Sequence, residues 1–200
     1  MSEAKPFGGI RVAEFGQFIA VPFCGQMLAD GGAEVIKVEA PSGDPTRRFN
    51  PLTPGESRIF LSRNRGKRSL PLRLSHPLAR PVIDQLLNWA DVVLINFRPG
   101  LEKDLGLDPG DLLIAHPKLV IASVTAFGKQ GPDAGLSGMD IVLQARSGLM
   151  EPMAVRRTVD RPQAIRSAPT ICALCAFPLE LPPHCCVVSV PAGAASSMSH

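Results

Sequence analysis

The amino-acid sequence predicts an α/β protein whose parallel sheet is covered by helices on both faces. Between residues 9 and 150, short apolar segments alternate with segments that repeat apolar residues at helical spacing. Several of the expected strands are almost continuously apolar, which is typical of parallel strands buried on both faces. The chain has 200 residues, of which 45% are hydrophobic, so it can bury a core of ordinary size.

Residues 9–40 predict one strand–helix–strand unit. The alternating run "GIRVAEF" (9–15) indicates a strand. A helix is expected to begin near Pro22, whose missing N–H costs nothing in a first turn, and to end at Gly31–Gly32. The β-branched run 33–40 predicts the next strand, parallel to the first because such crossovers are right-handed.

The same alternation continues to Met150. The stretch 68–74 is expected to be extended, and Pro71 favours an edge or a bulge there. The remaining elements are a helix over 76–90 with Pro81 in its first turn, a strand over 91–97, a short helix over 108–117, a strand over 119–128 and a helix over 139–150. After Met150 neither periodicity continues.

Composition excludes several classes of function. A net charge of +3, one Trp and no Tyr argue against a nucleic-acid surface. No apolar run approaches the roughly 18 residues of a membrane helix, so no membrane partner is expected. The start "MSEAKPFGG" lacks the pattern of a signal peptide, and five cysteines are an odd number. Together these features predict a cytoplasmic protein without a disulfide framework.

The expected carboxyl ends of the strands carry polar side chains, where open α/β sheets bind ligands. Gln17, Asn96, Arg98 and Lys129 lie there and suit a polar ligand. The first turn, "GQFIAVPFCG" (16–25), has bulky residues in place of the glycines that admit a pyrophosphate, so a standard NAD site is not expected.

The run "RIFLSRNRGKRS" (58–69) concentrates five basic residues. A solvated loop is the first interpretation, because most charged runs are solvated. A clamp for the phosphates of a ligand is the second, since Arg and Lys bind phosphate oxygens with charge-assisted bonds. A nucleic-acid patch is less favoured, because aromatic residues are absent from most of the run.

Five ordered motifs over residues 9–150 resemble class III CoA-transferases, the family of formyl-CoA transferase, carnitine CoA-transferase and α-methylacyl-CoA racemase. These are "GIRVAEFGQFIAVPFCGQMLADGGAEVIKVEAPSGDPTR", "FLSRNRGKRSLPLRL", "ADVVLINFRPG", "LVIASVTAFGKQGP" and "SGMDIVLQARSGLM". The resemblance implies a Rossmann-like large domain, incomplete in this chain, and an interlocked homodimer for the full-length protein. Residues 1–150 would be the N-terminal part of that large domain.

The resemblance also implies a reaction. The family moves CoA between an acyl-CoA and a carboxylic acid, using an Asp carboxylate as nucleophile. We expect such a CoA-transferase here, impaired in this chain; an acyl-CoA racemase and a catalytically inactive CoA-binding remnant remain alternatives. By matching position, contacts to CoA or acyl-CoA would come from Ile19, Ala20, Leu72, Arg73, Ser75, Asn96, Phe97 and Arg98. Ala40 and Asp104 stand where the family often has basic residues.

The catalytic Asp of the family is missing from its expected place. Cys172 lies about where the acid should be, and no Asp or Glu occurs between Arg161 and Phe177. The catalytic residue is therefore unknown, since anhydride chemistry requires a carboxylate. Cysteines 172, 175, 185 and 186 do not have the spacing of a zinc site, so no metal is expected.

The end of the chain predicts a change of reading frame near Phe177. Read one base out of frame, one permitted set of codons for 178–200 encodes A-G-A-S-S-A-L-L-R-R-E-R-T-G-R-G-G-E-L-N-V-S, which resembles the family's downstream R-R-E-x-T-G-x-G segment. Residues 151–177 are accordingly expected to be a diverged segment. Residues 178–200 are expected to be an out-of-frame, disordered tail.

Overall fold

A six-stranded sheet forms the centre of the computed structural model, which describes residues 5–49, 51–53, 56–148 and 186–189. The strand order is β5-β2-β1-β6-β7-β8. The first five are mutually parallel, and β8 pairs antiparallel with β7. The strands are β1 (Arg11–Phe15), β2 (Glu34–Glu39), β5 (Arg68–Pro71), β6 (Val92–Ile95), β7 (Val120–Val124) and β8 (Cys186–Ser189).

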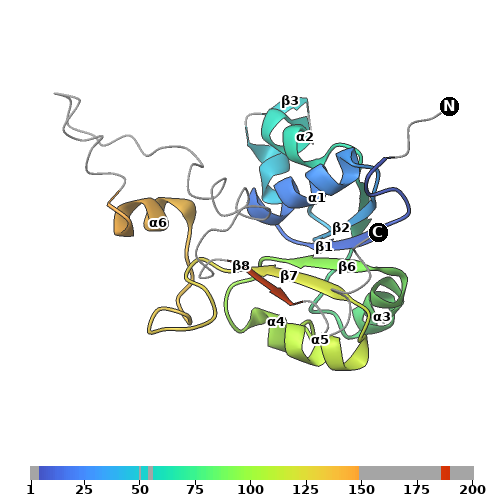
Figure 1. The fold of residues 1–200 in the computed structure, drawn as a ribbon. Helices are drawn as coiled ribbons and strands as arrows, with labels where there is room; N and C mark the ends of the chain where they lie inside the picture. Colours follow the sequence, from blue (N-terminus) through green and yellow to red (C-terminus); the bar gives the residue numbers. More distant parts are fainter. Residues whose placement is uncertain (1–4, 50, 54–55, 149–185, 190–200) are drawn as a thin grey trace.

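Helices cover both faces of this sheet (Figure 1). On one face α1 (Ala20–Asp30) packs on a cluster that includes Val12 and Val35. On the other, α3 (Arg80–Trp89) and α5 (Pro109–Ala115) pack on a larger cluster that includes Ala13. Val12 and Ala13 are neighbours whose side chains point to opposite faces, because side chains alternate along a strand. The expected α/β class and the helices on both faces are confirmed.

Shorter elements complete the described part. They are η1 (Pro45–Arg48), β3 (Pro51–Thr53), β4 (Glu56–Ser57), α2 (Arg58–Asn64), η2 (Pro77–Ala79), α4 (Leu101–Asp104) and α6 (Asp140–Arg146). The strands β3 and β4 form a separate antiparallel pair.

Most expected elements are present with shifted ends. The helix α1 begins two residues before Pro22, which therefore lies inside its first turn. The strand β5 is at the edge of the sheet and ends at Pro71, as its proline predicts. The helix expected over 76–90 is interrupted: η2 precedes α3, and Pro81 lies in the first turn of α3.

Most of the basic run does not form a loop. Residues 58–64 are the helix α2, whose first turn is capped by the Ser57 hydroxyl, which accepts a hydrogen bond from the Phe60 N–H at 3.0 Å. The interpretation of this run as a solvated loop is therefore wrong for its helical part.

The expected diverged segment and most of the expected tail lie outside the described residues, as do Cys172 and Cys175. Within the tail, residues 186–189 form β8, with Cys186 paired to Val124 and Ser189 to Ile121. The interpretation of residues 178–200 as an out-of-frame tail stays a prediction.

Candidate functional site

The residues predicted to contact a ligand lie in three segments at one edge of the sheet. These segments follow the carboxyl ends of β1, β5 and β6, which lie at the same edge because the strands are parallel. The strands β1 and β6 are neighbours, whereas β5 is separated from β6 by β2 and β1. Three strand spacings place the outer two segments about 14 Å apart, a distance that an extended ligand can span.

The turn after β1 is joined directly to Asn96, the first residue after β6. The Asn96 side-chain amide donates to the Gln17 carbonyl at 3.2 Å, and its oxygen accepts from the Gln17 N–H at 3.2 Å. Gly16 permits this approach, because a Cβ at position 16 would lie 2.4 Å from Val21 Cγ1 and 2.9 Å from Asn96 Oδ1. Gln17 and Asn96, both predicted as ligand residues, thus hold each other.

The next residue of the turn has an unusual backbone. Phe18 has a φ of 66°, the left-handed region that residues with a Cβ rarely occupy. Its ring is 47% exposed and lies 6.3 Å from the Phe49 ring, measured between centroids. Strained backbone of this kind persists only where surrounding contacts hold it, and it occurs frequently at functional sites.

The helix α1 begins immediately after Phe18, with Ile19 as its N-cap and Ala20 as its first residue. No side chain caps this end by a hydrogen bond, and its first turn contains no acidic residue. Backbone N–H groups at a helix N-terminus attract anions through their partial positive charge. The two predicted contact residues of this turn therefore offer backbone groups suited to an anionic ligand.

The segments after β5 and β6 meet around a hollow of about 280 Å³. Ser75 and His76 line it from one side, and Asp104 and Gly106 line it from the other. An Arg80 N–H closes it by donating to the Gly106 carbonyl at 3.1 Å. The structure therefore brings the predicted contact residue Ser75 close to the segment that follows Arg98.

The other predicted contact residues fall into two groups, one partly buried and one exposed. Leu72 and Phe97 are partly buried and pack against the larger core cluster, so their side chains fix the backbone of their segments. Arg73 and Arg98 are exposed, and neither forms an ion pair within the part of the chain that the structure describes. These two guanidinium groups are therefore available to a phosphate.

A network of buried charges lies beneath the first turn, on the α1 face of the sheet. Glu14 bonds two ammonium groups: Lys37 Nζ lies 3.1 Å from its Oε1, and Lys67 Nζ lies 2.6 Å from its Oε2. Asp44 pairs with Lys37 at 3.0 Å, and Asn64 Oδ1 accepts from Lys67 at 3.1 Å. The four charged side chains are at most 2% exposed.

Burial lowers the pKa of Lys67 to about 8, although Glu14 opposes this shift by favouring the charged ammonium. Lys67 is thus still mostly protonated at pH 7. The phosphate-clamp interpretation is wrong for Lys67, because its ammonium is enclosed within the protein and cannot reach a ligand.

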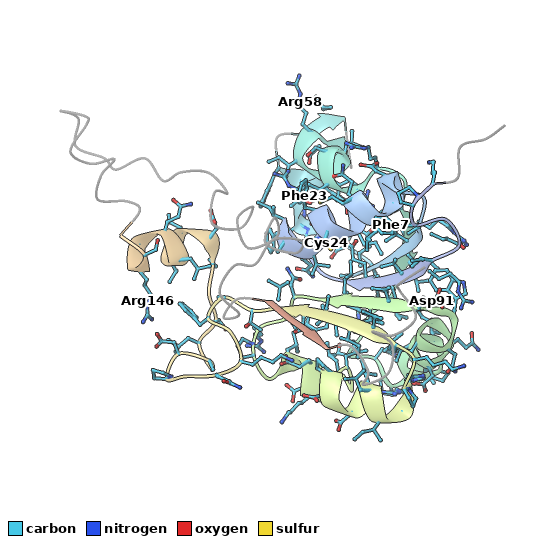
Figure 2. The ribbon with its side chains drawn as sticks, in the orientation of Figure 1. Phe7, Phe23, Cys24, Arg58, Asp91 and Arg146 are labelled. Carbon is cyan, nitrogen blue, oxygen red and sulfur yellow. The ribbon has the colours of Figure 1, made fainter. Side chains whose placement is uncertain are left out.

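Other basic residues of the run also pair internally. Arg65 bonds Asp30 at 2.6 Å, and Arg68 bonds Glu34 across β5 and β2. Arg58, in contrast, extends outward from α2 (Figure 2). Among the predicted contact residues, the cationic groups available to a phosphate are therefore those of Arg73 and Arg98.

A second cluster holds the turn after β2. Burial alone would raise the pKa of Glu39, but hydrogen bonds from Arg47, Ser69 and the Asp44 N–H outweigh it and lower the pKa to about 2. Arg47 makes both contacts of a forked pair, at 2.9 and 2.7 Å. Glu39 therefore organises this loop.

The buried network was not predicted from the sequence, although the sequence carries a signal for it. Glu14 and Lys37 are charged residues within strands that must be covered on both faces. They are also partners in the β1–β2 register. Opposite charges at paired positions of two buried strands indicate an ion pair, because a lone charge there would be too costly.

Two negative findings apply to the described residues alone. No helix in that part of the chain is long and apolar enough to cross a membrane. No group of three or more His, Cys, Asp or Glu side chains there could hold a metal ion.

Comparison with known protein families matches residues 7–175 to the model of CoA-transferase family III. The chain belongs to this family. The family III match includes all three segments of the candidate site and the buried network beneath them.

Named relatives of this family III chain are CoA-transferases. The "Probable fatty acyl-CoA transferase Rv3272" of Mycobacterium tuberculosis is 44% identical over 149 residues, covering 73% of this chain and 38% of that protein. The succinate–glutarate CoA-transferase of Agrobacterium fabrum is 44% identical over 154 residues, covering 72% and 38%. The chain thus spans less than two fifths of the length of these relatives.

Solved structures agree with the fold. A crystal structure of Rv3272 superposes with a TM-score of 0.72 at 43% identity, covering 82% of this chain and 45% of that one. A CAIB/BAIF family protein from Brucella suis superposes with a TM-score of 0.71 at 38% identity, covering 82% and 44%.

Proposed function

We propose that this chain is the CoA-binding N-terminal part of a CoA-transferase that moves CoA between an acyl-CoA and a carboxylic acid. One observation carries the proposal: the family match includes the carboxyl edge of the sheet, which is followed by the start of α1, by Asn96 and by the segments that line the hollow beside Ser75. The edge offers uncapped N–H groups and exposed guanidinium groups, which suit the phosphates of CoA.

Each predicted contact has a role in this proposal. The backbone of Ile19 and Ala20 would face the anionic ligand at the start of α1, and Arg73 and Arg98 would pair with phosphates. Asn96 would hold the turn, while Leu72 and Phe97 would keep their segments in place by packing. Ser75 would contact the ligand from the wall of the hollow. The carboxylate of Asp104 also lines this hollow and makes it less favourable for a phosphate.

The transfer itself needs a carboxylate that attacks the thioester carbonyl and releases the CoA thiolate. The chain has no acidic residue between Arg161 and Phe177, where the resemblance places that group. This observation favours a second candidate function: a CoA-binding remnant without chemistry. Racemisation is less favoured, because the relatives described above are named as transferases.

Calorimetric titration of the purified chain with CoA tests binding, and thioester exchange from succinyl-CoA to glutarate tests transfer. We expect binding that Arg98→Ala weakens about 5- to 20-fold through loss of a charge-assisted bond. Lys118→Ala is the matched control, because it removes an exposed cation at the opposite edge of the sheet. Absence of CoA binding by the wild-type chain would refute both candidate functions. Binding with transfer supports the transferase, and binding without transfer supports the remnant.

The full-length protein is also proposed to be a cytoplasmic homodimer, as the resemblance implies. The helix α6 supports an additional packing partner, because Met139, Ile141 and Val142 beside or within it are 71%, 53% and 39% exposed. Light scattering on the full-length protein would measure its mass. A monomeric mass would contradict this part of the proposal.

A further inference from the structure

Two buried ammonium groups hold the turn between β1 and α1 at its two ends. Lys37 Nζ donates to the Gly16 carbonyl at 2.7 Å, and Lys67 Nζ donates to the Pro22 carbonyl at 2.7 Å. Gly16 is the first residue of the turn that follows β1, and Pro22 lies in the first helical turn of α1. The residues between these two contacts include Ile19 and Ala20, which carry the proposed backbone contacts to CoA.

The hydrogen-bonding capacity of Lys67 is fully used. An ammonium has three N–H donors. Those of Lys67 go to Glu14 Oε2, Asn64 Oδ1 and the Pro22 carbonyl. A buried ammonium is tolerated only when its charge is paired and its donors are satisfied, so its position is closely determined. The carbonyl that accepts its third hydrogen bond is fixed with it.

The packing around this ammonium leaves little room for alternatives. A Cβ at Gly25 of α1 would lie 2.0 Å from Glu14 Oε2 and 3.2 Å from Lys67 Nζ. The helix can therefore lie this close to the ion pair only because residue 25 is a glycine. The first two turns of α1 and the buried charges are thus fitted to each other.

The turn needs such anchors because Phe18 has a left-handed backbone that its side chain disfavours. Three contacts oppose relaxation of the turn: Lys37 at Gly16, Asn96 at Gln17 and Lys67 at Pro22. Of these three side chains, Lys67 alone reaches the start of α1.

We propose that Lys67 is a positioning residue, which fixes the start of α1 through the Pro22 carbonyl and thereby presents the Ile19 and Ala20 backbone to CoA. The positioning itself is a property of the ligand-free chain. Its effect on CoA rests on the proposed function.

Hydrogen–deuterium exchange of the full 200-residue chain tests the positioning without any ligand. In Lys67→Met, amides of the turn, including Gln17 and Phe23, should exchange at least 10-fold faster than in the wild type. Amides of β6 and β7 should keep their wild-type rates. Lys118→Met is the matched control, because it makes the same substitution at an exposed site on the opposite edge, and it should leave both sets unchanged.

Wild-type exchange in the turn of Lys67→Met would overturn the proposal, as would an equal acceleration throughout the sheet. If Lys67→Met does not fold, Asn64→Ala decides, because it keeps both charges. It removes one of the three acceptors of Lys67, together with the hydrogen bond from Asn64 to the Phe60 carbonyl. About threefold faster exchange confined to the turn supports the proposal in that variant, and wild-type exchange overturns it. Lys67→Arg, which keeps the charge and donors, should restore part of the protection.

CoA titration of the same variants tests the second step. Lys67→Met should weaken CoA binding at least 10-fold, whereas Lys118→Met should not. Faster exchange with unchanged CoA affinity would overturn the link to the ligand. If the wild-type chain binds no CoA, the proposed function fails, while the exchange rates still decide whether Lys67 positions the turn.

Discussion

Glu14 and Lys37 occupy paired positions on neighbouring buried strands, and their side chains form an ion pair at 3.1 Å with almost no exposure to solvent. The same Glu14 carboxylate also bonds Lys67 at 2.6 Å. One carboxylate therefore connects the middle of the sheet to both anchors of the first turn. Its removal tests how far the fold depends on this network.

Glu14→Gln should destabilise the chain by about 3–5 kcal/mol, because it leaves two buried ammonium groups with one carboxylate fewer. Glu34→Gln is the matched control, since it breaks an exposed pair with Arg68 and should cost about 1 kcal/mol or less. Urea denaturation of both variants measures the free energies of unfolding. Equal losses in the two would contradict the buried network.

Glu39 should make stability depend on pH in the acid range. Its pKa is about 2 in the folded chain, below the ordinary value of 4.5, so the native state gives up its proton more readily than the unfolded state. The stabilisation is therefore fully present above pH 4.5 and is lost as the pH falls through 2. We expect a loss on the order of 1–3 kcal/mol, because partial exposure of Arg47 screens the pair.

Glu39→Gln removes this dependence and serves as the reference. The difference in free energy of unfolding between the wild type and this variant should shrink as the pH falls from about 5 to about 2.5. Thermal or urea denaturation at several pH values measures it. A difference that stays constant across this range would contradict the lowered pKa of Glu39.

Phe18 should reverse the usual stability order of alanine and glycine. Because φ is 66° at this position, Phe18→Gly should be more stable than Phe18→Ala by about 1 kcal/mol. Phe7, a comparably exposed ring outside the left-handed region, is the control (Figure 2). There the alanine variant should be at least as stable as the glycine variant. The same order at both positions in chemical denaturation would be inconsistent with strain at Phe18.

Asp104 should weaken CoA binding by repelling a phosphate from the hollow beside Ser75. Asp104→Asn should therefore tighten CoA binding about 2- to 10-fold at low ionic strength, and the gain should decrease in salt. Asp111→Asn, at an exposed position on α5, is the matched control and should not change the affinity. Unchanged affinity in Asp104→Asn would indicate that phosphates do not approach this hollow.

The gene should show a change of reading frame near codon 177. Sequencing from codon 145 to well past codon 200 should show the R-R-E-x-T-G-x-G segment in the adjacent frame, followed by coding sequence for the rest of a family III protein. The matched residues end at 175, close to the proposed position. A confirmed sequence with no such segment in any frame would contradict this prediction.

The order and type of the main elements could be predicted because apolar periodicity is a local property. The strand over residues 92–95 and the edge position of Pro71 follow from β-branched runs and from a missing N–H. The helical start of the basic run was missed, since arginines favour a helix as readily as a solvated loop. Ser57, its cap, was the overlooked local signal.

The candidate site was predictable only in outline. The sequence places polar residues after several strands, and the parallel arrangement then brings those strand ends to one edge. Which of these residues touch was not predictable: Asn96 holds Gln17 across 79 residues of chain, and Arg80 reaches Gly106. Such contacts depend on strand order and side-chain direction, which no local pattern specifies.

By itself, the sequence determined the α/β class, the family and the three segments that carry the candidate site, because periodicity and motifs are written in consecutive residues. The tertiary structure decided which charges are available to a ligand. It buries Lys67 against Glu14 and leaves Arg73 and Arg98 exposed, although all three are cations within the motifs of the resemblance. The physical reason is that a charge is fixed by residue type, whereas its solvation is set by distant segments that fold over it.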